Sequence, residues 1–586
     1  MKIGSWVRAV ALDELEGPGP FALSVKGVDV VVVRTRDGLR AFDGRCPHQG
    51  ALLGEGEFDG ETLVCRNHRW RFAVDSGRRD GGPQCLASCP VDVRDGALYF
   101  DVSGLSRKME LTAPKRDIEH LPGPKGLPIL GNLHQIKPAQ FHLILERWAV
   151  QFGSPYLFHV PGRRIVVVTD PKWADQALRA RPETFRRSVK TAEILGEMGI
   201  DGVFIAEGEA WRPQRKLSVA ALAQRHFRAL YPSIEMVTTR LLSRWRKLAD
   251  AGEALDLVDE MKRFTVDVTT LMTFGYDINT IEQDDDLIQR KLDLVFPAIV
   301  RRLLAPFPTW RYLRLPKDRQ LDKAVAELRD WLGELIARTK ELLAREPERA
   351  GRPSNFIEAM LVARDDDGKP FPERVIFGNL MTMLLAGEDT TANTLAWAVH
   401  ELFDHPQWMG ELRREAGEVL GSSEVAGSVD QANALESAGA VANETMRLRP
   451  VAPFNIVQAI ADTTVGDLRV PKGTLLAFLT RAPATAPIHF EAPKAFRPER
   501  WLTPVKGAHN AAVHIPFGSG PRICPGRALA LVEMNTLLSM LYKNFDLERV
   551  GARDDVGEEY GFTMSPVGLQ GRMRRREAAV AEMAMN

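Results

Sequence analysis

The first hundred residues consist of short apolar runs separated by turn signals, which is the pattern of an antiparallel β unit. Residues 28–33 and 98–102 are rich in β-branched and aromatic side chains and have the length of strands. Three segments that contain Asp-Gly predict turns between such runs: Arg36-Asp37-Gly38, Phe42-Asp43-Gly44 and Arg94-Asp95-Gly96. We therefore expect an all-β fold over about residues 5–102.

From about residue 139 the apolar positions recur at helical spacing. Long stretches with this spacing predict helices at 231–250, 319–346, 372–404 and 436–449. Strand patterns interrupt the helices at 156–168 and at about 455–480. This second part of the chain is therefore predicted to be mainly α-helical with a minor amount of β structure.

Two segments separate the β part from the helical part. Residues 104–120 are polar and mixed in charge, which is typical of a linker, and segment 121–131 has too much proline and glycine for a helix. With 586 residues the chain is also too long for one hydrophobic core. We predict a small antiparallel β-sandwich at 1–103, a linker at 104–120, and a mainly α-helical domain with minor β structure at 121–586.

Charge and composition narrow the class of protein. The 77 basic and 77 acidic residues give no net charge, so we expect no nucleic-acid partner. Residues 1–25 show no signal peptide, and the longest apolar stretches, such as 380–386, are far shorter than the roughly 18–20 residues of a membrane span. We expect a cytoplasmic protein without a transmembrane anchor.

Two pairs of cysteine and histidine lie in the β part. They are Cys46-Pro47-His48 and Cys65-Arg66-Asn67-His68, with sixteen residues between the first histidine and the second cysteine. Two thiolates and two neutral imidazoles can bind a binuclear iron cluster, with the cysteines on one iron and the histidines on the other. The alternative is a zinc site, although zinc knuckles usually pair Cys with Cys and His with His. We predict a [2Fe–2S] cluster held by Cys46, His48, Cys65 and His68.

The remaining cysteines of this part, Cys85 and Cys89, are expected to be small buried residues, and Cys89 could line the cluster pocket. Over residues 1–103 the chain resembles Rieske ferredoxins and the ferredoxin-like domain of aromatic-ring dioxygenases. Pro47, Gly50 and the aromatic stretch 70–72 belong to this resemblance. It implies a Rieske domain that carries one electron at a time.

A second metal-binding pattern lies near the C-terminus, in Phe517-x-x-Gly520-x-Arg522-x-Cys524-x-Gly526. Cys524 as a thiolate can ligate a haem iron. The glycines allow backbone N–H groups to approach the sulfur, and Arg522 can make charge-assisted bonds to a haem propionate. Five fixed positions at one spacing arise by chance in only about one chain in several thousand.

Three further patterns accompany this loop. Glu444 and Arg447 lie on one helical face, upstream of Arg500; alone they would be a surface ion pair. Trp211 and Arg215 are one helical turn apart, and alone they would be a core tryptophan beside a surface arginine. The third pattern places an acid and hydroxyls inside a long apolar helix, Ala386-Gly387-Glu388-Asp389-Thr390-Thr391, where the alternative is a kink with solvated charges.

Together the four patterns resemble the cytochrome P-450 superfamily over residues 121–586. The resemblance implies haem b (iron protoporphyrin IX) on Cys524, with Trp211 and Arg215 reaching a propionate. It implies that Ala386 and Gly387 leave room for dioxygen and that Asp389 and Thr390 take part in oxygen activation, Asp389 by relaying protons. Glu444, Arg447 and Arg500 would form a structural triad.

The sequence departs from that family at two places. Gln458 lies near the position where many members have a cation for a propionate, so one salt bridge to the haem would be missing. Residues 481–487 replace a His-Arg-Asp-type stretch, which leaves the local loop conformation open. Segment 303–315 falls where the family has its channel lid; the alternative is a packed surface loop.

The two resemblances together imply a haem-thiolate monooxygenase that hydroxylates an apolar organic molecule with O2. Its electrons would come through its own Rieske domain from a separate NAD(P)H-dependent flavoprotein reductase. One alternative is an oxygen-independent or peroxide-driven haem-thiolate enzyme, and another is a non-enzymatic two-iron redox sensor or carrier. The sequence leaves the substrate, the reductase, the nicotinamide preference and the oligomeric state open.

Overall fold

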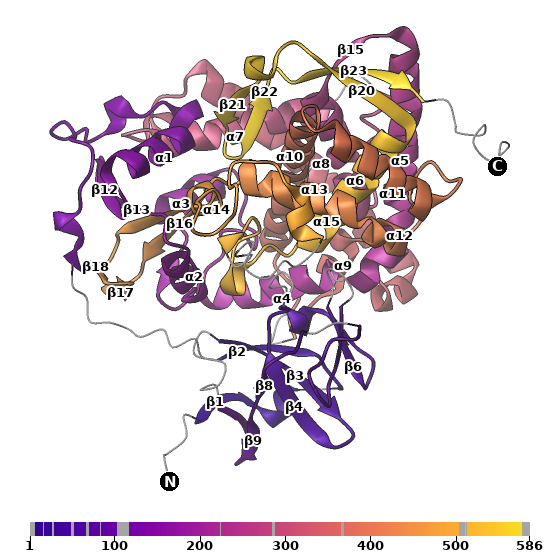
Figure 1. The fold of residues 1–586 in the computed structure, drawn as a ribbon. Helices are drawn as coiled ribbons and strands as arrows, with labels where there is room; N and C mark the ends of the chain where they lie inside the picture. The colour runs from indigo at the N-terminus through magenta and orange to yellow at the C-terminus, as the bar shows by residue number, and fades with distance from the viewer. Residues whose placement is uncertain are drawn as a thin grey trace.

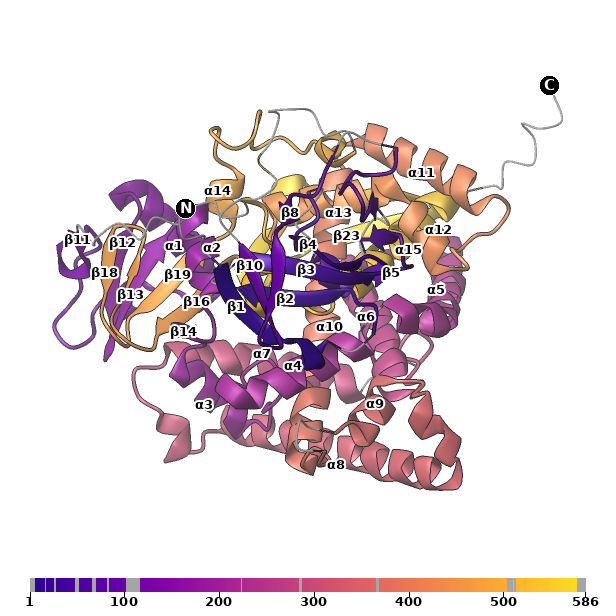
Figure 2. The ribbon, with the colours of Figure 1, turned by 90° about the horizontal axis from the view of Figure 1, so that it is seen from below.

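The structure is a computed structural model, and Figure 1 shows its fold. It describes residues 6–15, 17–25, 28–47, 52–65, 70–81, 84–101, 116–222, 224–283, 287–364, 368–502, 510 and 513–576. A strand-rich unit, in indigo, lies beneath a larger helical body and next to helix α4 (Trp211–Ala221). The view from below shows the same unit in front of the larger body (Figure 2).

The strand-rich unit consists of three antiparallel sheets, with strand orders β1-β10-β9, β2-β3-β4-β8 and β5-β6-β7. Its strands are β1 (Trp6–Ala11), β2 (Phe21–Val25), β3 (Val28–Thr35), β4 (Gly38–Asp43), β5 (Glu57–Phe58), β6 (Thr62–Val64), β7 (Arg71–Ala73), β8 (Ser88–Cys89), β9 (Val91–Arg94) and β10 (Ala97–Asp101). The all-β prediction for this part is confirmed.

Strand β3 is buried on both faces, which explains its unbroken run of valines. Val31 and Val33 pack with Cys46 in one apolar cluster, and Val30 and Val32 pack against the side of β10 in another. The strand therefore connects the loop of the first predicted ligand to the rest of the unit.

Two of the three predicted turns in this unit occur. Residues 36–37 turn between β3 and β4, and Asp95-Gly96 joins β9 to β10 with φ angles of 50° and 71°, which suit a tight hairpin. The predicted turn at Phe42-Asp43-Gly44 is wrong, because Phe42 and Asp43 continue β4. There β4 pairs with β3 and β8, and pairing between distant segments overrides the local turn signal.

The larger body is mainly helical, as predicted. The helices predicted at 231–250, 319–346, 372–404 and 436–449 correspond to α5, α8, α10 and α13. The helices are α1 (Phe141–Phe152), α2 (Pro171–Arg179), α3 (Val189–Glu197), α4, α5 (Gln224–Ala251), α6 (Leu257–Phe274), α7 (Leu287–Leu304), α8 (Pro316–Arg345), α9 (Phe356–Val362), α10 (Glu373–Leu402), α11 (Pro406–Leu420), α12 (Val429–Ala434), α13 (Glu436–Leu448), α14 (Arg481–Ala484) and α15 (Arg527–Asn544).

The minor β structure of this body lies mostly at one side, in a five-stranded sheet of order β12-β13-β19-β16-β14. Its strands are β12 (Tyr156–Val160), β13 (Arg163–Val168), β14 (Phe185–Arg186), β16 (Phe454–Ala459) and β19 (Leu475–Leu479). Smaller sheets are formed by β15 (Ala254–Asp256), β20 (Phe545–Val550) and β23 (Gln570–Arg575), and by the hairpin of β21 (Gly557–Tyr560) and β22 (Met564–Val567).

The predicted linker overlaps this β structure. Strand β11 (Arg116–Asp117) pairs in parallel with β18 (Leu468–Val470), which in turn pairs with β17 (Thr463–Val465). Residues 102–115 lie outside the described residues. The pairing of the larger body thus begins at Arg116, five residues before the predicted boundary at 121.

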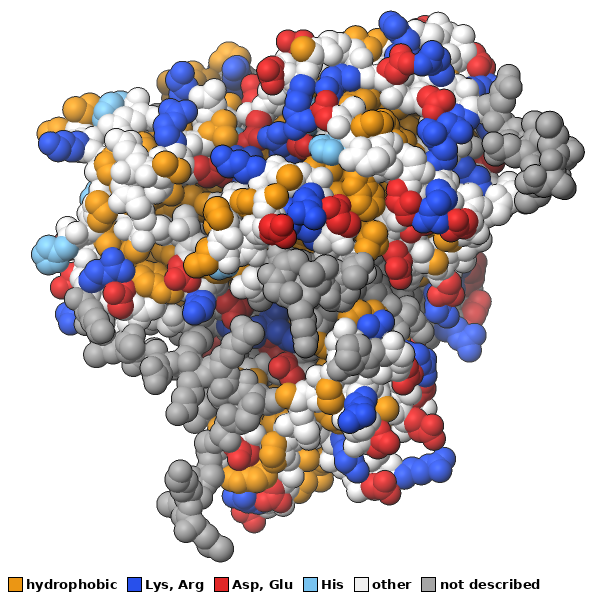
Figure 3. Space-filling view, viewed as in Figure 1, with side chains coloured by type: hydrophobic (Ala, Val, Ile, Leu, Met, Phe, Trp, Pro, Cys, Tyr) orange, Lys and Arg blue, Asp and Glu red, His pale blue; other side chains and the backbone are white. Residues whose placement is uncertain are grey.

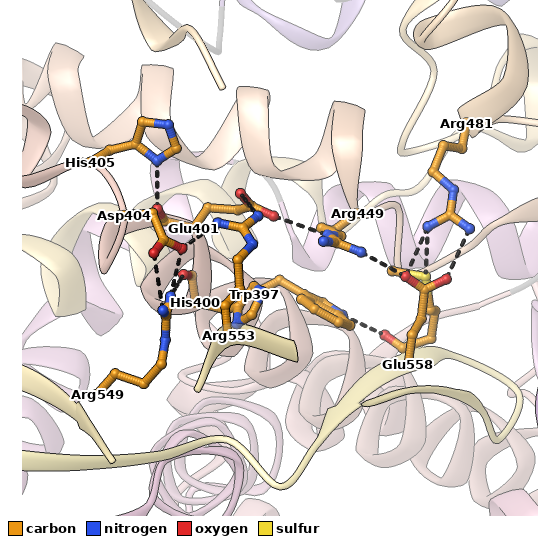
Figure 4. A network of polar contacts seen from close by, with 11 residues as sticks. Trp397, His400, Glu401, Asp404, His405, Arg449, Arg481, Arg549, Arg553 and Glu558 are labelled. Atoms are coloured by element: carbon orange, nitrogen blue, oxygen red, sulfur yellow. Dashed lines mark hydrogen bonds and ion pairs between the residues drawn. The ribbon is translucent and has the colours of Figure 1, made fainter. Parts of the chain in front are cut away.

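The stretch 481–487, whose conformation the sequence left open, begins with helix α14 and an ion-pair network (Figure 4). Arg481 lies 2.7 Å from Glu146 of α1 and 2.8 Å from Glu558 of β21. Glu558 also pairs with Arg449 at 2.9 Å, and Arg449 pairs with Glu401 of α10 at 3.0 Å. These charges connect the C-terminal half of α10 to the sheet side of the body.

Candidate functional site

The two predicted cysteine ligands of the strand-rich unit lie in one buried cluster. Cys46 follows β4 and Cys65 follows β6, and both side chains are buried. They pack in the same apolar cluster, whose other buried members are Val31, Val33, Phe42, Leu53, Leu63, Phe72, Val74 and Leu86. The predicted histidine ligands, His48 and His68, lie outside the described residues. The fold thus brings the two cysteine loops, far apart in sequence, to one place.

Backbone hydrogen bonds close both loops at their bases. Leu53 N donates to Gly44 O at 2.7 Å, and Cys65 N donates to Trp70 O at 2.8 Å. The side chain of Trp70 lies under Arg79, 3.4 Å from ring centroid to guanidinium carbon. These hydrogen bonds bring the described ends of each loop next to each other.

The other two cysteines of this unit differ from each other. Cys89 is buried, as predicted, and burial together with Asp101 and Asp43 raises the pKa of its thiol to about 11. The prediction is wrong for Cys85, which is exposed and donates from Sγ to Ser76 O at 3.4 Å. Neither pattern nor spacing distinguishes the two in sequence.

The C-terminal cysteine loop lies directly before α15. Cys524 N donates to Phe517 O at 2.9 Å, which closes the loop around the cysteine, and α15 begins three residues later at Arg527. A helix N-terminus favours a nearby thiolate. Gly520 has φ +72°, and a Cβ there would lie 2.6 Å from Leu178 O of α2, so this position requires glycine.

A concentration of cations lies beside this loop. The guanidinium of Arg522 stacks over Trp211, 4.6 Å from the ring centroid, and its Nη2 donates to Glu207 Oε2 at 2.6 Å. Burial, together with repulsion from Arg181 and Arg215, lowers the pKa of Arg522 to about 10, although Glu207 opposes the shift. The predicted residues Trp211, Arg215 and Arg522 are therefore close together, as the sequence implied.

Two members of this group were missed in the sequence. Arg181 lies 3.3 Å from Glu207, and Arg187 stacks on Phe204 at 3.6 Å. Burial lowers the pKa of Arg187 to about 9, and repulsion from Arg181 and Arg522 contributes to the shift. The cluster of arginines between 179 and 187 was the available signal, but no spacing rule connects it to the distant loop.

The hydroxyl and acid predicted for oxygen chemistry lie in the middle of α10. Ala386 is exposed there although most of the surrounding residues of the helix are buried, and Thr390 Oγ1 donates to Ala386 O at 2.9 Å. A Cβ on Gly387 would lie 2.7 Å from Thr269 Oγ1 of α6. Gly387 is thus required for the packing of α10 on α6, a reason that the resemblance did not supply.

Comparison with known proteins decides the family. The model of the cytochrome P450 family matches residues 121–571. The chain belongs to the cytochrome P450 family. The model of the Rieske [2Fe-2S] domain matches residues 5–91, so the protein is a Rieske domain followed by a P450 monooxygenase domain. Its cofactors are accordingly a [2Fe–2S] cluster and haem.

Several curated proteins and solved structures are similar to this protein over most of its length. Protein LUTEIN DEFICIENT 5, chloroplastic, of Arabidopsis thaliana is 25% identical over 79% of this chain and 78% of its own length. The mitochondrial 25-hydroxyvitamin D-1 alpha hydroxylase of Homo sapiens is 28% identical over 75% of this chain and 89% of its own. The crystal structure of the cytochrome P450DA heme domain shares the fold, with a TM-score of 0.68 at 22% identity over 80% of this chain and 99% of that one.

The cationic group of the P450 domain fits a haem propionate. Among the described residues, Nε and Nη1 of Arg522 and Nε of Arg181 are buried donors without a hydrogen-bond partner. Buried donors of this kind are costly unless an acceptor satisfies them, and a carboxylate between them would do so. Gln458 does not take part, because its side-chain amide bonds Val189 N at 3.1 Å and Gly473 O at 3.1 Å.

Asp389 of the P450 domain contacts two other elements, the β21–β22 hairpin and α6. Thr563, at the tip of the β21–β22 hairpin, donates a hydrogen bond to Asp389 Oδ2, and Lys262 Nζ of α6 lies 3.7 Å from Oδ1. Lys262 also pairs with Asp293 of α7 at 2.8 Å. Burial raises the pKa of the Asp389 carboxyl, whereas Lys262 and the Thr563 hydroxyl oppose that shift.

A cavity of about 590 Å³ reaches Asp389 from between α7 and the β21–β22 hairpin. Its walls combine the polar group around Lys262 with the apolar side chains of Phe296, Val300 and Tyr560. The volume is that of a small-molecule site, which typically measures about 300–1,000 Å³. The cavity therefore connects an acid on α10 to a space large enough for an organic molecule.

Segment 303–315, predicted as a lid or a packed loop, has features of both. Phe307 and Tyr312 are 62% and 87% exposed, whereas Trp310 is buried and donates from Nε1 to Glu197 Oε2 at 2.9 Å. Lys190 of α3 donates to Ala305 O at 2.8 Å. Trp310 thus anchors the segment, and the exposed rings lie on either side of it in sequence.

The predicted structural triad is a buried ion-pair cluster. Arg447 Nη2 lies 2.7 Å from Glu444 Oε1, and Arg500 Nε lies 3.3 Å from the same oxygen. Trp501 Nε1 donates to Glu444 Oε2 at 3.0 Å. The side chains of Glu444 and Arg447 have no exposed surface, so the interpretation as a surface pair does not hold.

The described residues include no helix that is both long and apolar enough to cross a membrane. On the face that Figure 3 shows, basic and acidic side chains are interspersed.

Proposed function

We propose that the P450 domain hydroxylates an apolar organic molecule with O2 and receives its electrons through the Rieske domain from a separate NAD(P)H-dependent flavoprotein reductase. In the overall reaction, a C–H bond of the substrate, O2, two electrons and two protons give a C–OH group and H2O. The flavoprotein converts the hydride of NAD(P)H into single electrons, and the Rieske cluster carries them one at a time. Bound haem supplies the iron at which O2 is reduced.

The observation that carries the use of O2 is the acid–alcohol pair on α10. Asp389 is buried, hydrogen-bonded to Thr563 and close to Lys262, while Thr390 beside it is partly exposed near Ala386. Burial raises the pKa of Asp389, which suits a carboxyl that has to take up a proton as well as release one. We propose Asp389 and Thr390 as the catalytic residues, with Asp389 passing protons from the cavity toward Thr390.

The remaining residues are proposed as cofactor ligands and contacts. Cys46, His48, Cys65 and His68 would hold the cluster, and Cys524 the haem iron. The haem contacts would come from Trp211, Arg215, Ala386, Gly387, Phe517, Gly520, Arg522 and Gly526, to which the geometry adds Arg181 and Arg187. An apolar substrate is supported by the exposed rings of Phe307 and Tyr312 in segment 303–315.

Two substitutions test the proposal. In Thr390→Ala, we expect NAD(P)H and O2 consumption to continue while product per NAD(P)H falls; unchanged coupling would contradict the role of Thr390, and product formed from H2O2 without NAD(P)H would favour a peroxide-driven enzyme. In Cys46→Ser, we expect loss of the cluster's paramagnetic resonance signal and of product, with the carbon-monoxide spectrum of the haem retained. Cys85→Ser is the matched control, because Cys85 is exposed in the same domain. Product formation by Cys46→Ser without its cluster would contradict the donor role.

A purified holoprotein can also be screened with a library of apolar molecules. An optical spin-state shift identifies the substrate class, and O2 consumption with that molecule distinguishes an enzyme from a redox sensor. No shift and no O2 consumption with any molecule would favour the sensor.

A further inference from the structure

An ion pair joins the Rieske domain to the P450 domain. Arg179 Nη1, at the C-terminal end of α2, lies 2.6 Å from Asp29 Oδ2 on β3. The two side chains are only 16% and 12% exposed. Exposed ion pairs contribute little to association. A charge-assisted hydrogen bond that is largely removed from water is stronger, and removing one of its partners leaves the other charge buried without a partner, which weakens association.

In the Rieske domain, Asp29 is hydrogen-bonded to the residues that directly precede Cys46. The same oxygen, Oδ2, accepts a hydrogen bond from Arg45 Nε at 2.8 Å, and Arg45 directly precedes Cys46. The backbone of Asp29 accepts from Gly44 N at 2.8 Å. A Cβ on Gly44 would lie 2.7 Å from the carbonyl carbon of Asp29, so this close approach requires glycine.

In the P450 domain, Arg179 is connected through Asp175 to the loop that contains Cys524. Arg179 Nε donates to Asp175 Oδ2 at 2.7 Å, and Asp175 Oδ1 accepts from Ser519 Oγ at 2.7 Å. Ser519 lies five residues before Cys524, and the next residue, Gly520, lies against the last turn of α2. Burial alone would lower the pKa of Arg179, but Asp29 and Asp175 raise it above its usual value.

We propose that the Asp29–Arg179 ion pair docks the Rieske domain on the cysteine side of the haem site and places the Cys46 loop opposite the Cys524 loop. The contacts form one continuous series from Arg45 through Asp29, Arg179 and Asp175 to Ser519. Asp29 and Arg179 are positioning residues: they transfer no electron themselves. The inference rests on the proposed function, in which the reduced cluster loses one electron and the ferric haem gains it.

The test uses the full-length holoprotein with both cofactors bound. In Asp29→Arg and in Arg179→Asp, we expect small-angle scattering to show a more extended molecule. We also expect the amides of the last turn of α2 to exchange hydrogen at least about tenfold faster. Asp29→Asn and Arg179→Gln, which remove the pair without placing like charges beside Arg45 or Asp175, should change both signals in the same direction. Asp92→Arg is the matched control, because Asp92 pairs at 2.8 Å with Arg94 inside the Rieske domain, on β9.

Three results of these measurements would overturn the proposal. Unchanged scattering and exchange in both single variants would overturn the proposal, as would an equal change in Asp92→Arg. A concentration-dependent dimer that dissociates in the single variants would show that the pair joins two copies, and would also overturn it.

The rate of haem reduction after the cluster is reduced provides a second readout. If scattering and exchange show that docking is lost but haem reduction is as fast as before, the ion pair is the docking contact and docking does not limit electron transfer to the haem; failure of the donor role is shown separately by Cys46→Ser. If haem reduction slows while scattering and exchange are unchanged, the ion pair does not dock the domains.

Discussion

Lys262 on α6 and Asp389 on α10 lie 3.7 Å apart, from Nζ to Oδ1, at the end of a cavity that reaches the surface between α7 and the β21–β22 hairpin. The ammonium is shared, because Nζ is also 2.8 Å from Asp293 and 3.9 Å from Glu388. Burial alone would lower the pKa of Lys262, but the three carboxylates raise it above its usual value. One cation thus holds carboxylates from two helices beside the proposed proton path.

Lys262→Met should therefore disturb Asp389 more than any exposed lysine substitution would. Without the ammonium, the pKa of Asp389 rises further, because burial is no longer opposed by a nearby cation. We expect product formation about tenfold slower and a larger solvent isotope effect, since proton transfer contributes about 10²–10⁴-fold to catalysis. Lys291→Met is the control, because Lys291 pairs at 3.0 Å with Glu327 in the contact of α7 with α8. Equal effects of both substitutions would contradict the role of Lys262.

Glu444→Gln should destabilise the P450 domain strongly. Glu444 accepts from Arg447, Arg500 and Trp501 in a fully buried cluster, and breaking a buried ion pair on one side costs about 3–5 kcal/mol. We expect a loss of this size in the free energy of unfolding in urea. Glu334→Gln, which breaks an exposed pair with Arg338 on α8, should change it by less than about 0.5 kcal/mol. Similar losses in both variants would show that the buried cluster contributes no more to the free energy of unfolding than an exposed ion pair does.

Gly520→Ala separates steric conflict from backbone strain when it is compared with Gly518→Ala. Both glycines have positive φ, +72° and +78°, but a Cβ meets Leu178 O at 2.6 Å only at Gly520, and nothing within 4 Å at Gly518. We expect Gly518→Ala to cost about 1–2 kcal/mol. Gly520→Ala should cost more and reduce the fraction of chains that bind haem, measured by the carbon-monoxide difference spectrum. Equal haem contents in the two variants would show that α2 shifts to accommodate the added methyl group at this contact.

Glu533→Gln should flatten the pH dependence of stability. Burial raises the pKa of Glu533 from its usual 4.5 to about 8, although Thr391 opposes the shift. Because the folded-state pKa is the higher one, the contribution of this carboxyl is fully present below about pH 4.5 and is lost as pH rises toward 8. The loss is on the order of 4 kcal/mol at pH 8. Urea unfolding at pH 5, 6, 7 and 8 should give curves that converge at low pH and separate at high pH; parallel curves would exclude a raised pKa.

Much of the site could be predicted because its residues form recognisable patterns within short stretches of sequence. Trp211 with Arg215, Glu444 with Arg447, and the loop from Phe517 to Gly526 are each local in sequence. Lys262, Thr563, Arg181 and Arg187 could not be predicted in this way. They reach the site across tertiary contacts, and a lone lysine or arginine has no pattern that distinguishes it from a solvated one.

The sequence by itself determined the two-part architecture, the long helices and the metal-binding loops, because helical spacing, turn residues and ligand spacing are local properties. Only the tertiary structure decided that Phe42 and Asp43 continue a strand, that Gly387 is required by α6, and that Asp29 meets Arg179 across the domain boundary. These depend on which distant segments pack together. That choice follows from the sum of many weak apolar and polar contacts over the whole chain and is not contained in any short segment.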